Sequence, residues 1–355
     1  MRLFAIAVVT LFLLGCASHD TRTVSIDKLM QRYSGNVPGA SVLVLKQGVP
    51  VIRKSYGLAE LETQRVTTPA TNYRLASVTK QFTATAILLL RKDGKLTLDD
   101  SIRHWLPALP AEDEPITLRH LLTHTSGLID YEDLMPASQS IQLDDTDVLR
   151  MLSAEHRLYF APGTAYRYSN SGYVLLGLVI ERASGQSLPA FLKQRIFDPL
   201  GMSHTLLYQR GHGPEIAERA FGYSHEKTGW ARTDQDLTSA TRGDGGIYSS
   251  IDDLALWDAA LYDHRLLDDA SRAEAFAAHT STDDATIQYG YGWRITGDTL
   301  WHSGESIGFR NVIVRWPKRY LTVIVLTNRN DPEPYRTALA IAEPFPRDSG
   351  NAGSP

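Results

Sequence analysis

Short runs rich in β-branched apolar residues lie near both ends of the chain. The runs ASVLVLKQ and VPVIRKSYG, separated by Gly48, are rich in β-branched residues and predict a β-hairpin. Late in the chain, four further runs predict strands, namely YGYGWRIT, DTLWHSG, GFRNVIVRWP and YLTVIVLTN. Strands are therefore expected at both ends, with a long stretch of different character between them.

That middle stretch shows helical spacing. Its most apolar helix, KQFTATAILLLRKDG, is expected to start at about Thr79 and to stop at Gly94, because glycine suits a helix C-terminus. Helices are also predicted by ITLRHLLTH, DTDVLRMLSAE, SGYVLLGLVIERASG and LPAFLKQRIF. Elsewhere, a first helix is expected with Ser25 as its N-cap, and a later one after Ser250, which is spaced with Asp253 as a capping box. A short helix should follow the last strand.

The order of strands, helices and strands predicts an α+β fold. Strands from both ends should share one antiparallel sheet flanked by helices, with an all-α lobe at about residues 77–240 inserted into the sheet lobe. We expect one domain over residues 25–345, with a site in the cleft between the two lobes. The last residues, 346–355, are polar and rich in glycine and serine, and are expected to be disordered.

The N-terminus predicts export and lipidation. One Arg is followed by an apolar run from Leu3 to Leu14, which is shorter than the roughly 20 residues of a membrane-spanning helix and is typical of a signal peptide at residues 1–15. The sequence Leu-Leu-Gly-Cys at its end resembles a bacterial lipobox, which implies a lipid on Cys16 and a polar tether at residues 16–24. An ordinary signal peptide with a chance cysteine is the alternative. The resemblance places the protein in the bacterial cell envelope, periplasm-facing, and Ala17 after the cysteine weakly favours the outer membrane.

Composition excludes some classes of function. The chain has 355 residues, a net charge of −4 and no block of Lys or Arg, which argues against a nucleic-acid partner. Because it contains a single Cys, no disulfide can form within one chain. The sequence does not indicate an oligomeric state.

A first candidate nucleophile fails on the order of residues. The segment GESIG matches the G-x-S-x-G elbow of α/β-hydrolases, which would make Ser306 the nucleophile. That elbow needs a helix after the Ser and a His further along the chain, yet the last His is His302 and the run after Ser306 predicts a strand. We therefore interpret Ser306 as a bystander and look elsewhere for the nucleophile.

A Ser three residues before a Lys on a helix places both side chains on one face, where a partly desolvated Lys can take the Ser proton. The chain contains this spacing three times, at Ser25/Lys28, Ser77/Lys80 and Ser224/Lys227. Only Ser77 stands at a predicted junction between a strand and a strongly apolar helix, where burial would hold it and its backbone N–H could stabilise an oxyanion. Ser77 and Lys80 are therefore the expected nucleophile and base.

A second group of polar residues precedes the helix SGYVLLGLVIE. In YRYSNSGY, the phenol of Tyr168 could relay a proton to a leaving group, and the amide of Asn170 could hold a substrate carbonyl. The alternative is that Tyr168 is a packed aromatic and that Asn170 is only a helix cap. Spacing alone does not decide between these interpretations.

A family resemblance becomes specific at this point. The chain resembles the serine β-lactamase and penicillin-binding-protein superfamily, on the branch of class C β-lactamases, D-stereospecific peptidases and related esterases. The matching stretches are YRLASVTKQFTA, GKLTLDDSI, ITLRHLLTHTSGL, FAPGTAYRYSNSGYVLLGLVIE, IFDPLGM, GDGGIYSSIDDLALW and WHSGESIGFRN. The resemblance implies a β-lactamase/transpeptidase-like fold without a cofactor. It also implies Ser77 as the acylated nucleophile, Lys80 as its base, Tyr168 as proton relay and Asn170 as a substrate contact.

The resemblance also implies a third motif, K-T-G or H-x-G, on a strand that lines the cleft. Lys227-Thr228-Gly229 is a literal match but lies in a polar, turn-like stretch, whereas His302-Ser303-Gly304 lies on a late strand in the family's order. We choose the latter, which gives an oxyanion hole made by the backbone N–H groups of Ser77 and Glu305. His302 could hydrogen-bond Tyr168, and it is a weaker cation than the Lys of class C β-lactamases.

Two further features complete the expectations. If the Glu305 carboxylate faces the pocket, it would repel a substrate carboxylate and attract an amine, whereas Arg310 is expected to be an exposed strand residue. His120 and His124 have the i,i+4 spacing of a metal site, but Leu121 replaces the Glu of zinc proteases, so no metal is predicted.

The expected function is that of a cofactor-free serine hydrolase acting through an acyl-enzyme on small peptides, amides or esters. The substrate could derive from peptidoglycan. A class C-like β-lactamase is the first alternative. A non-catalytic envelope protein that binds cell-wall peptides is the second.

Overall fold

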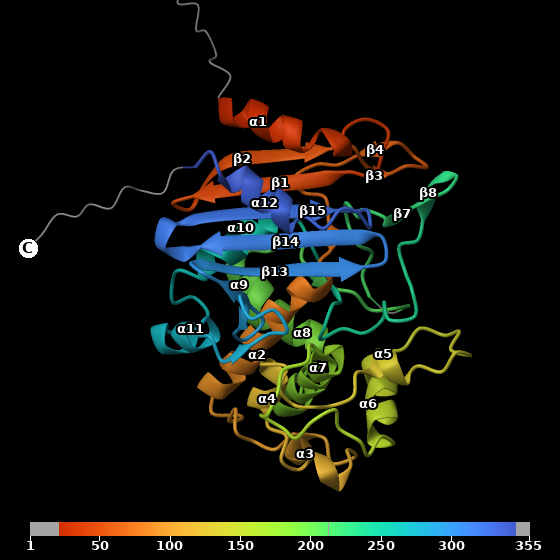
Figure 1. Cartoon of the computed structure of the whole chain (residues 1–355), viewed down its shortest axis with the longest axis vertical. Helices are drawn as coiled ribbons and strands as arrows, with labels where there is room; N and C mark the ends of the chain where they lie inside the picture. Colours follow the sequence, from red (N-terminus) through yellow and green to blue (C-terminus); the bar gives the residue numbers. More distant parts are fainter. Residues whose placement is uncertain (1–20, 212, 346–355) are drawn as a thin grey trace, which may run out of the picture.

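The computed structural model describes residues 21–211 and 213–345, and its largest sheet is built from both ends of the chain. The strands of this sheet are β1 (Ala40–Lys46), β2 (Val49–Tyr56), β10 (Thr280–Ser281), β11 (Gln288–Tyr289), β12 (Arg294–Thr296), β13 (Thr299–Ser306), β14 (Phe309–Trp316) and β15 (Leu321–Thr327). In the described residues it is an eight-stranded antiparallel sheet with the order β10-β11-β12-β13-β14-β15-β1-β2 (Figure 1). The predicted N-terminal hairpin therefore pairs with the last strand, with Val44 opposite Val323.

Helices make up most of the remaining chain. The α-helices are α1 (Thr21–Leu29), α2 (Lys80–Lys92), α3 (Ile102–Trp105), α4 (Leu118–Leu122), α5 (Tyr131–Leu134), α6 (Asp145–Ser153), α7 (Asn170–Ser184), α8 (Leu188–Leu192), α9 (Asp198–Leu200), α10 (Ile251–Ala260), α11 (Asp269–Ala275) and α12 (Tyr335–Ala342). The remaining strands are β3 (Leu58–Glu60), β4 (Arg65–Val66), β5 (Tyr73–Arg74), β6 (Leu206–Leu207), β7 (Tyr223–Glu226), β8 (Gly229–Arg232) and β9 (Ile247–Ser249). A 3₁₀ turn, η2 (Ala76–Thr79), leads directly into α2.

Both faces of the large sheet are buried at strands β1, β14 and β15, and side chains alternate between the two faces along each strand. In β1, Val42 and Val44 pack with α1 and α12 in one apolar cluster, whereas Leu43 and Leu45 belong to a larger cluster on the other face. Figure 1 shows α12 in front of the sheet and the block of α2, α7 and α8 beyond β13. The sheet therefore forms a central layer between helices.

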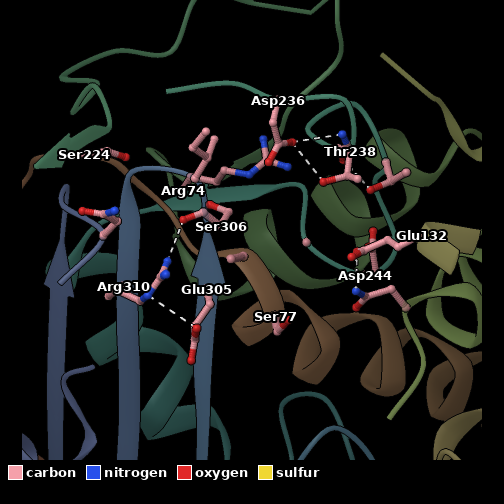
Figure 2. Close-up of a pocket in the computed structure, with 16 residues that line it drawn as sticks. Arg74, Ser77, Glu132, Ser224, Asp236, Thr238, Asp244, Glu305, Ser306 and Arg310 are labelled. Atoms are coloured by element: carbon pink, nitrogen blue, oxygen red, sulfur yellow. Dashed lines mark hydrogen bonds and ion pairs between the residues drawn. The ribbon is translucent and has the colours of Figure 1, made fainter. Parts of the chain in front are cut away.

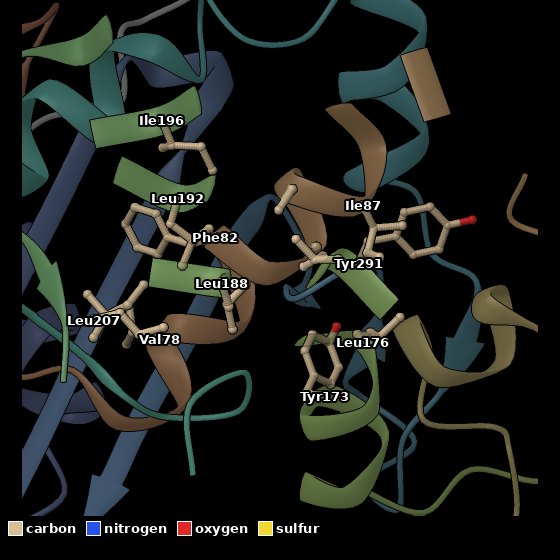
Figure 3. Packing of buried hydrophobic residues seen from close by; sticks show 14 of the residues in the cluster. Val78, Phe82, Ile87, Tyr173, Leu176, Leu188, Leu192, Ile196, Leu207 and Tyr291 are labelled. Atoms are coloured by element: carbon tan, nitrogen blue, oxygen red, sulfur yellow. The ribbon is translucent and has the colours of Figure 1, made fainter. Parts of the chain in front are cut away.

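Helix α2 runs through the middle of the larger cluster. Every residue from Lys80 to Leu90 is buried, and Phe82 stacks on Trp257 with ring centroids 4.1 Å apart. Figure 3 shows Phe82 surrounded by aliphatic side chains from α8 and β6. Fully burying a side chain of this size contributes about 1.5–3 kcal/mol. This packing fixes the start of α2, where Ser77 and Lys80 lie.

Some details of the sequence-based picture need correction. Helix α1 begins at Thr21, so Ser25 is an exposed residue within the helix and not its N-cap. Ser250 does cap α10, but the Asp253 carboxylate accepts hydrogen bonds from His204 N and Thr205 Oγ1, so the box is only half formed. The stretch YGYGWRIT is broken at Gly292 (φ 74°) into β11 and β12. The block expected to be all-α also holds β6, β7 and β8.

Candidate active site

Ser77 lies in η2, between strand β5 and helix α2, as the pattern predicted. The preceding residue, Ala76, has φ 49°, in the left-handed region that costs a non-glycine residue about 1 kcal/mol or more. The Ser77 side chain is half-buried and lines a pocket of about 350 Å³ (Figure 2). Strain of this kind persists only where the surroundings hold it, here the buried start of α2.

The Lys80 ammonium is fully buried behind Ser77 and donates three hydrogen bonds. Its Nζ lies 3.2 Å from Ser77 Oγ, 2.8 Å from Asn170 Oδ1 and 2.9 Å from the backbone O of Asp244. The two amide oxygens can only accept, whereas the Ser77 hydroxyl can also donate. When the amine is neutral, its two N–H bonds therefore fit the amide oxygens, and its lone pair is left to accept the proton of Ser77. This geometry suits a general base.

Asn170 and Tyr168 are brought to the same place by the start of α7. The N-cap of α7 is Ser169, so the side chain of Asn170 is free to bind Lys80 and, through Nδ2, Glu132 Oε1 at 2.9 Å. Asn170 is thus not merely a cap. The half-buried ring of Tyr168 has its centroid 4.9 Å from Lys80 Nζ, which places the phenol beside the predicted base.

Gly304 on β13 lies against the backbone of the nucleophile. A Cβ atom at Gly304 would lie 2.0 Å from Leu75 O and 3.3 Å from Ser77 N, so only glycine fits here. This contact brings the strand that carries Glu305 to the edge of the pocket next to Ser77. The predicted oxyanion pair of Ser77 and Glu305 N–H groups remains a prediction.

His302 is buried beside the pocket and does not line it. Its Nδ1 lies 2.6 Å from Ser303 O, which can only accept, so the proton is on Nδ1 and Nε2 accepts from Tyr289 OH at 3.0 Å. Burial and the charge of Arg294 hold the pKa of His302 well below its usual value, so the ring is neutral. The expected hydrogen bond to Tyr168 is wrong for the described residues, because Tyr289 occupies that nitrogen.

Carboxylates that sequence reasoning missed line the pocket near Ser77. Glu132 comes from α5, and Asp244 from the loop before β9; Figure 2 shows them close together on one side of Ser77. Asp244 is 6% exposed, and within the described chain its Oδ1 has no hydrogen-bond partner. Burial raises the pKa of both carboxyls, while the Lys80 charge acts in the opposite direction on each. Neither residue belongs to a pattern that marks it in the sequence.

The opposite wall of the pocket is formed by the end of β13 and the start of β14. Glu305 does line the pocket, but its carboxylate lies 3.4 Å from Arg310 Nε, and the two charges offset each other. The expectation that Arg310 is an exposed strand residue is wrong, because it lines the pocket and donates to the backbone O of Ser306 and of Phe309. Ser306 also lines the pocket, and a turn and strand β14 follow it, as the pattern predicted, where an α/β-hydrolase elbow would have a helix.

The rival Ser/Lys pairs lack a buried Lys. Ser25 and Lys28 are both exposed on α1. Ser224 lines the pocket and hydrogen-bonds Thr233, but Lys227 is exposed in the turn between β7 and β8. His120 Nδ1 accepts from Thr117 N within a helix cap. In the part of the chain that the structure describes, no group of three or more His, Cys, Asp or Glu could hold a metal ion.

Comparisons with known proteins agree with the fold and with the family resemblance. A family model described as Beta-lactamase matches residues 26–343. Penicillin-binding protein 4* of Bacillus subtilis is 35% identical, with 84% of this chain and 70% of that protein covered. Protein flp of Staphylococcus aureus is 28% identical, with 86% and 63% covered. The chain thus spans about two thirds of the length of these relatives.

A solved structure is similar over nearly the whole chain. The crystal structure of D-amino acid amidase from Ochrobactrum anthropi, complexed with L-phenylalanine amide, gives a TM-score of 0.78 at 26% identity, with 92% of this chain and 98% of that one covered. The fold is thus that of a serine hydrolase. The chain belongs to the β-lactamase family, as the motifs predicted.

Cys16 and its predicted lipid anchor lie outside the described residues, as does the tail at 346–355. Among the residues that are described, none of the helices has both the length and the apolar character needed to cross a membrane.

Proposed function

We propose that the protein hydrolyses small amides or peptides through an acyl-enzyme on Ser77. Lys80 takes the proton of Ser77, and Oγ attacks the carbonyl carbon of the substrate. As the bond to the leaving group breaks, Tyr168 gives the leaving group a proton and regains one from Lys80. Water then attacks the ester and releases the acid, with the same groups moving its proton. The contacts of Lys80 support this proposal, because Ser77 is the one partner that can donate to a neutral amine.

The preferred acyl group carries an ammonium ion, as in an amino-acid amide or a peptide with a free N-terminus. Glu132 and Asp244 place two carboxyls in the pocket, whereas the neighbouring cations Lys80 and Arg74 already donate to other partners. The Asp244 Oδ1 without a partner would gain a hydrogen bond from a substrate N–H. The relative that is described as a D-amino acid amidase supports the same class of substrate.

The two alternatives are less well supported. A β-lactamase must hold the carboxylate of its substrate, but His302 is neutral and buried, and Arg310 is paired with Glu305. The other Arg that lines the pocket, Arg74, is 3% exposed and donates to the backbone O of Ser239. A non-catalytic binding protein would have no need of a buried Lys80 in contact with Ser77. Both alternatives can be tested together with the proposal.

The deciding experiment combines intact-mass labelling with a substrate panel. We expect a fluorophosphonate to label the wild type and not Ser77→Ala. We also expect D-alanine p-nitroanilide to be hydrolysed with a kcat/KM at least about tenfold above that of its N-acetyl derivative, which corresponds to about 1.4 kcal/mol of charge recognition. Glu132→Gln should reduce this ratio. Glu305→Gln is the matched control and should leave the ratio unchanged, because that carboxylate is already paired.

The opposite results are as informative. No adduct with the fluorophosphonate or with a penicillin would favour the binding protein, and a penicillin adduct that turns over rapidly would favour the β-lactamase. Equal rates for the free and acetylated anilides would refute the preference for an ammonium ion.

The lipid anchor on Cys16 stays part of the proposal, with peptidoglycan-derived peptides as candidate substrates in the envelope. Cys16→Ser should move the protein from the detergent phase to the aqueous phase in a phase-partition experiment. A wild-type protein that already stays in the aqueous phase would contradict the anchor.

A further inference from the structure

His124 lies beneath the catalytic pocket in a conformation that few residues adopt. It follows the end of α4 with φ 59°, and its side chain is 1% exposed. The left-handed region is uncommon for a residue other than glycine, although His adopts it more often than most, and the surrounding structure must favour it. Its contacts show which part of the molecule depends on it.

These contacts lie on both sides of Tyr168. The Nδ1 atom of His124 accepts from Ser169 N at 3.1 Å, and its backbone O accepts from Arg167 N at 3.0 Å. Between these two bonds, the imidazole ring packs on the phenol ring of Tyr168, with centroids 4.4 Å apart. One residue therefore fixes the backbone before and after Tyr168 and supports the ring itself.

The ring must be neutral to make these contacts. Because Nδ1 accepts a backbone N–H, the single proton of the neutral ring is on Nε2. Burial, together with the charge of Lys80, holds the pKa of His124 well below its usual value. Within the described residues, Nε2 has no hydrogen-bond partner, and Tyr166, Tyr173 and Tyr289 surround the ring. The hydrogen bond from Ser169 N to Nδ1 is thus the contact that orients this side chain.

We propose that His124 is a positioning residue that orients Tyr168 for proton transfer to the leaving group. The inference rests on the proposed function, because it assigns His124 a role through the relay of Tyr168. Loss of the Nδ1 acceptor would free the backbone at Ser169 and allow the phenol to move. Small displacements of a catalytic group cost far more rate than stability.

The leaving group separates this role from a purely structural one. A p-nitroanilide leaves as a strongly basic amide ion unless it is protonated, whereas p-nitrophenolate leaves without a proton. A mispositioned Tyr168 should therefore slow the anilide and spare the ester. Loss of folded protein would lower both rates by the same factor, and fluorophosphonate titration of Ser77 corrects for it.

Two variants of similar shape provide the test. His124→Asn keeps an acceptor at the position of Nδ1 and tolerates the left-handed conformation, whereas His124→Leu removes the acceptor. Per titrated site, we expect His124→Leu to lower kcat/KM, which reports acylation and not the shared deacylation step, for the anilide by about 100-fold, the size of a general-acid contribution, and for the ester by less than about fivefold. His124→Asn should recover most of the rate on the anilide.

Equal losses on both substrates, or no recovery by His124→Asn, would overturn the inference. If His124→Leu does not fold, His124→Gln replaces it, because the Gln amide extends to the position of Nε2 and leaves Nδ1 without a substitute. Tyr168→Phe separates a failure of the proposed relay by Tyr168 from a failure of the positioning role of His124. A selective loss in Tyr168→Phe that is absent from the His124 variants refutes only the positioning role, whereas no selective loss in Tyr168→Phe refutes the relay and this inference with it.

Discussion

Replacing Gly304 with Ala should abolish activity while the protein still folds. The added Cβ would lie 2.0 Å from Leu75 O, and an ordinary contact is at least 3.4 Å, so strand β13 and the turn that carries Ser77 must separate by roughly 1.4 Å. A displacement of about 1 Å between catalytic groups costs on the order of 100-fold in rate. We therefore expect kcat/KM for a p-nitrophenyl ester to fall at least about 100-fold.

The control is Gly297→Ala, in the turn before the same strand. A Cβ there meets no atom within 4 Å, although φ is 58°, so the change carries a backbone cost of about 1 kcal/mol without moving Ser77. Thermal unfolding and size-exclusion chromatography establish that both variants are folded. A folded Gly304→Ala variant that keeps more than a tenth of the wild-type kcat/KM would refute the argument that this close contact positions the nucleophile.

Three further predictions concern the base, the core and the effect of pH. Lys80→Met should slow labelling of Ser77 by a fluorophosphonate about 10²–10⁴-fold, the range of a general base, and labelling at the wild-type rate would contradict its role. Asp258→Ala should lower the free energy of unfolding by about 3–5 kcal/mol in urea denaturation, because the buried Arg315, 2.6 Å from Asp258 Oδ1 in the wild type, would lose its charged partner. A decrease below about 1 kcal/mol would exclude a stabilising role for this ion pair. Burial and the neighbouring Glu112 raise the pKa of Asp113 to about 6. Between pH 4 and pH 6 the folded chain therefore holds a proton on Asp113 that the unfolded chain has released. The free energy of unfolding should fall as the pH rises through this range. Asp113→Asn should remove that fall and should be more stable than the wild type at pH 7. Urea denaturation of both proteins at pH 4 and pH 7 can check this.

The fold was predictable because its signals are local and repeated. The short β-branched runs of β1 and β15 and the long apolar run of α2 keep their predicted structure, since both faces of these two strands and all sides of that helix are buried. Helix boundaries were less predictable. Helix α1 extends to Thr21, and this could not be read from the polar sequence there, because its stability comes from packing on α12 and not from its own propensity.

The residues of the candidate site could be predicted only where they belong to sequence motifs with a fixed spacing. Ser77 and Lys80 are one helical turn apart, so local spacing brings them together whatever the rest of the chain does. The carboxylate of Asp244 reaches the same pocket from 167 residues further along the chain than Ser77, and nothing near Asp244 indicates a partner at that distance. The pairing of Tyr289 with His302 likewise depends on how β11 to β13 pack, which spacing alone cannot predict.

The missed carboxylates bear on how substrate binding could act on the chemical step. The charge of Lys80 lowers the pKa of Glu132 and Asp244 against the effect of burial, so Lys80 interacts electrostatically with both carboxyls. A substrate ammonium ion would interact with the same carboxyls and change their interaction with Lys80. Because Lys80 exchanges a proton with Ser77 in the proposed reaction, that change would act on catalysis as well as on binding. On this argument, the advantage of a free amine over its acetylated form should be found in kcat as well as in KM, and an advantage in KM alone would exclude the coupling.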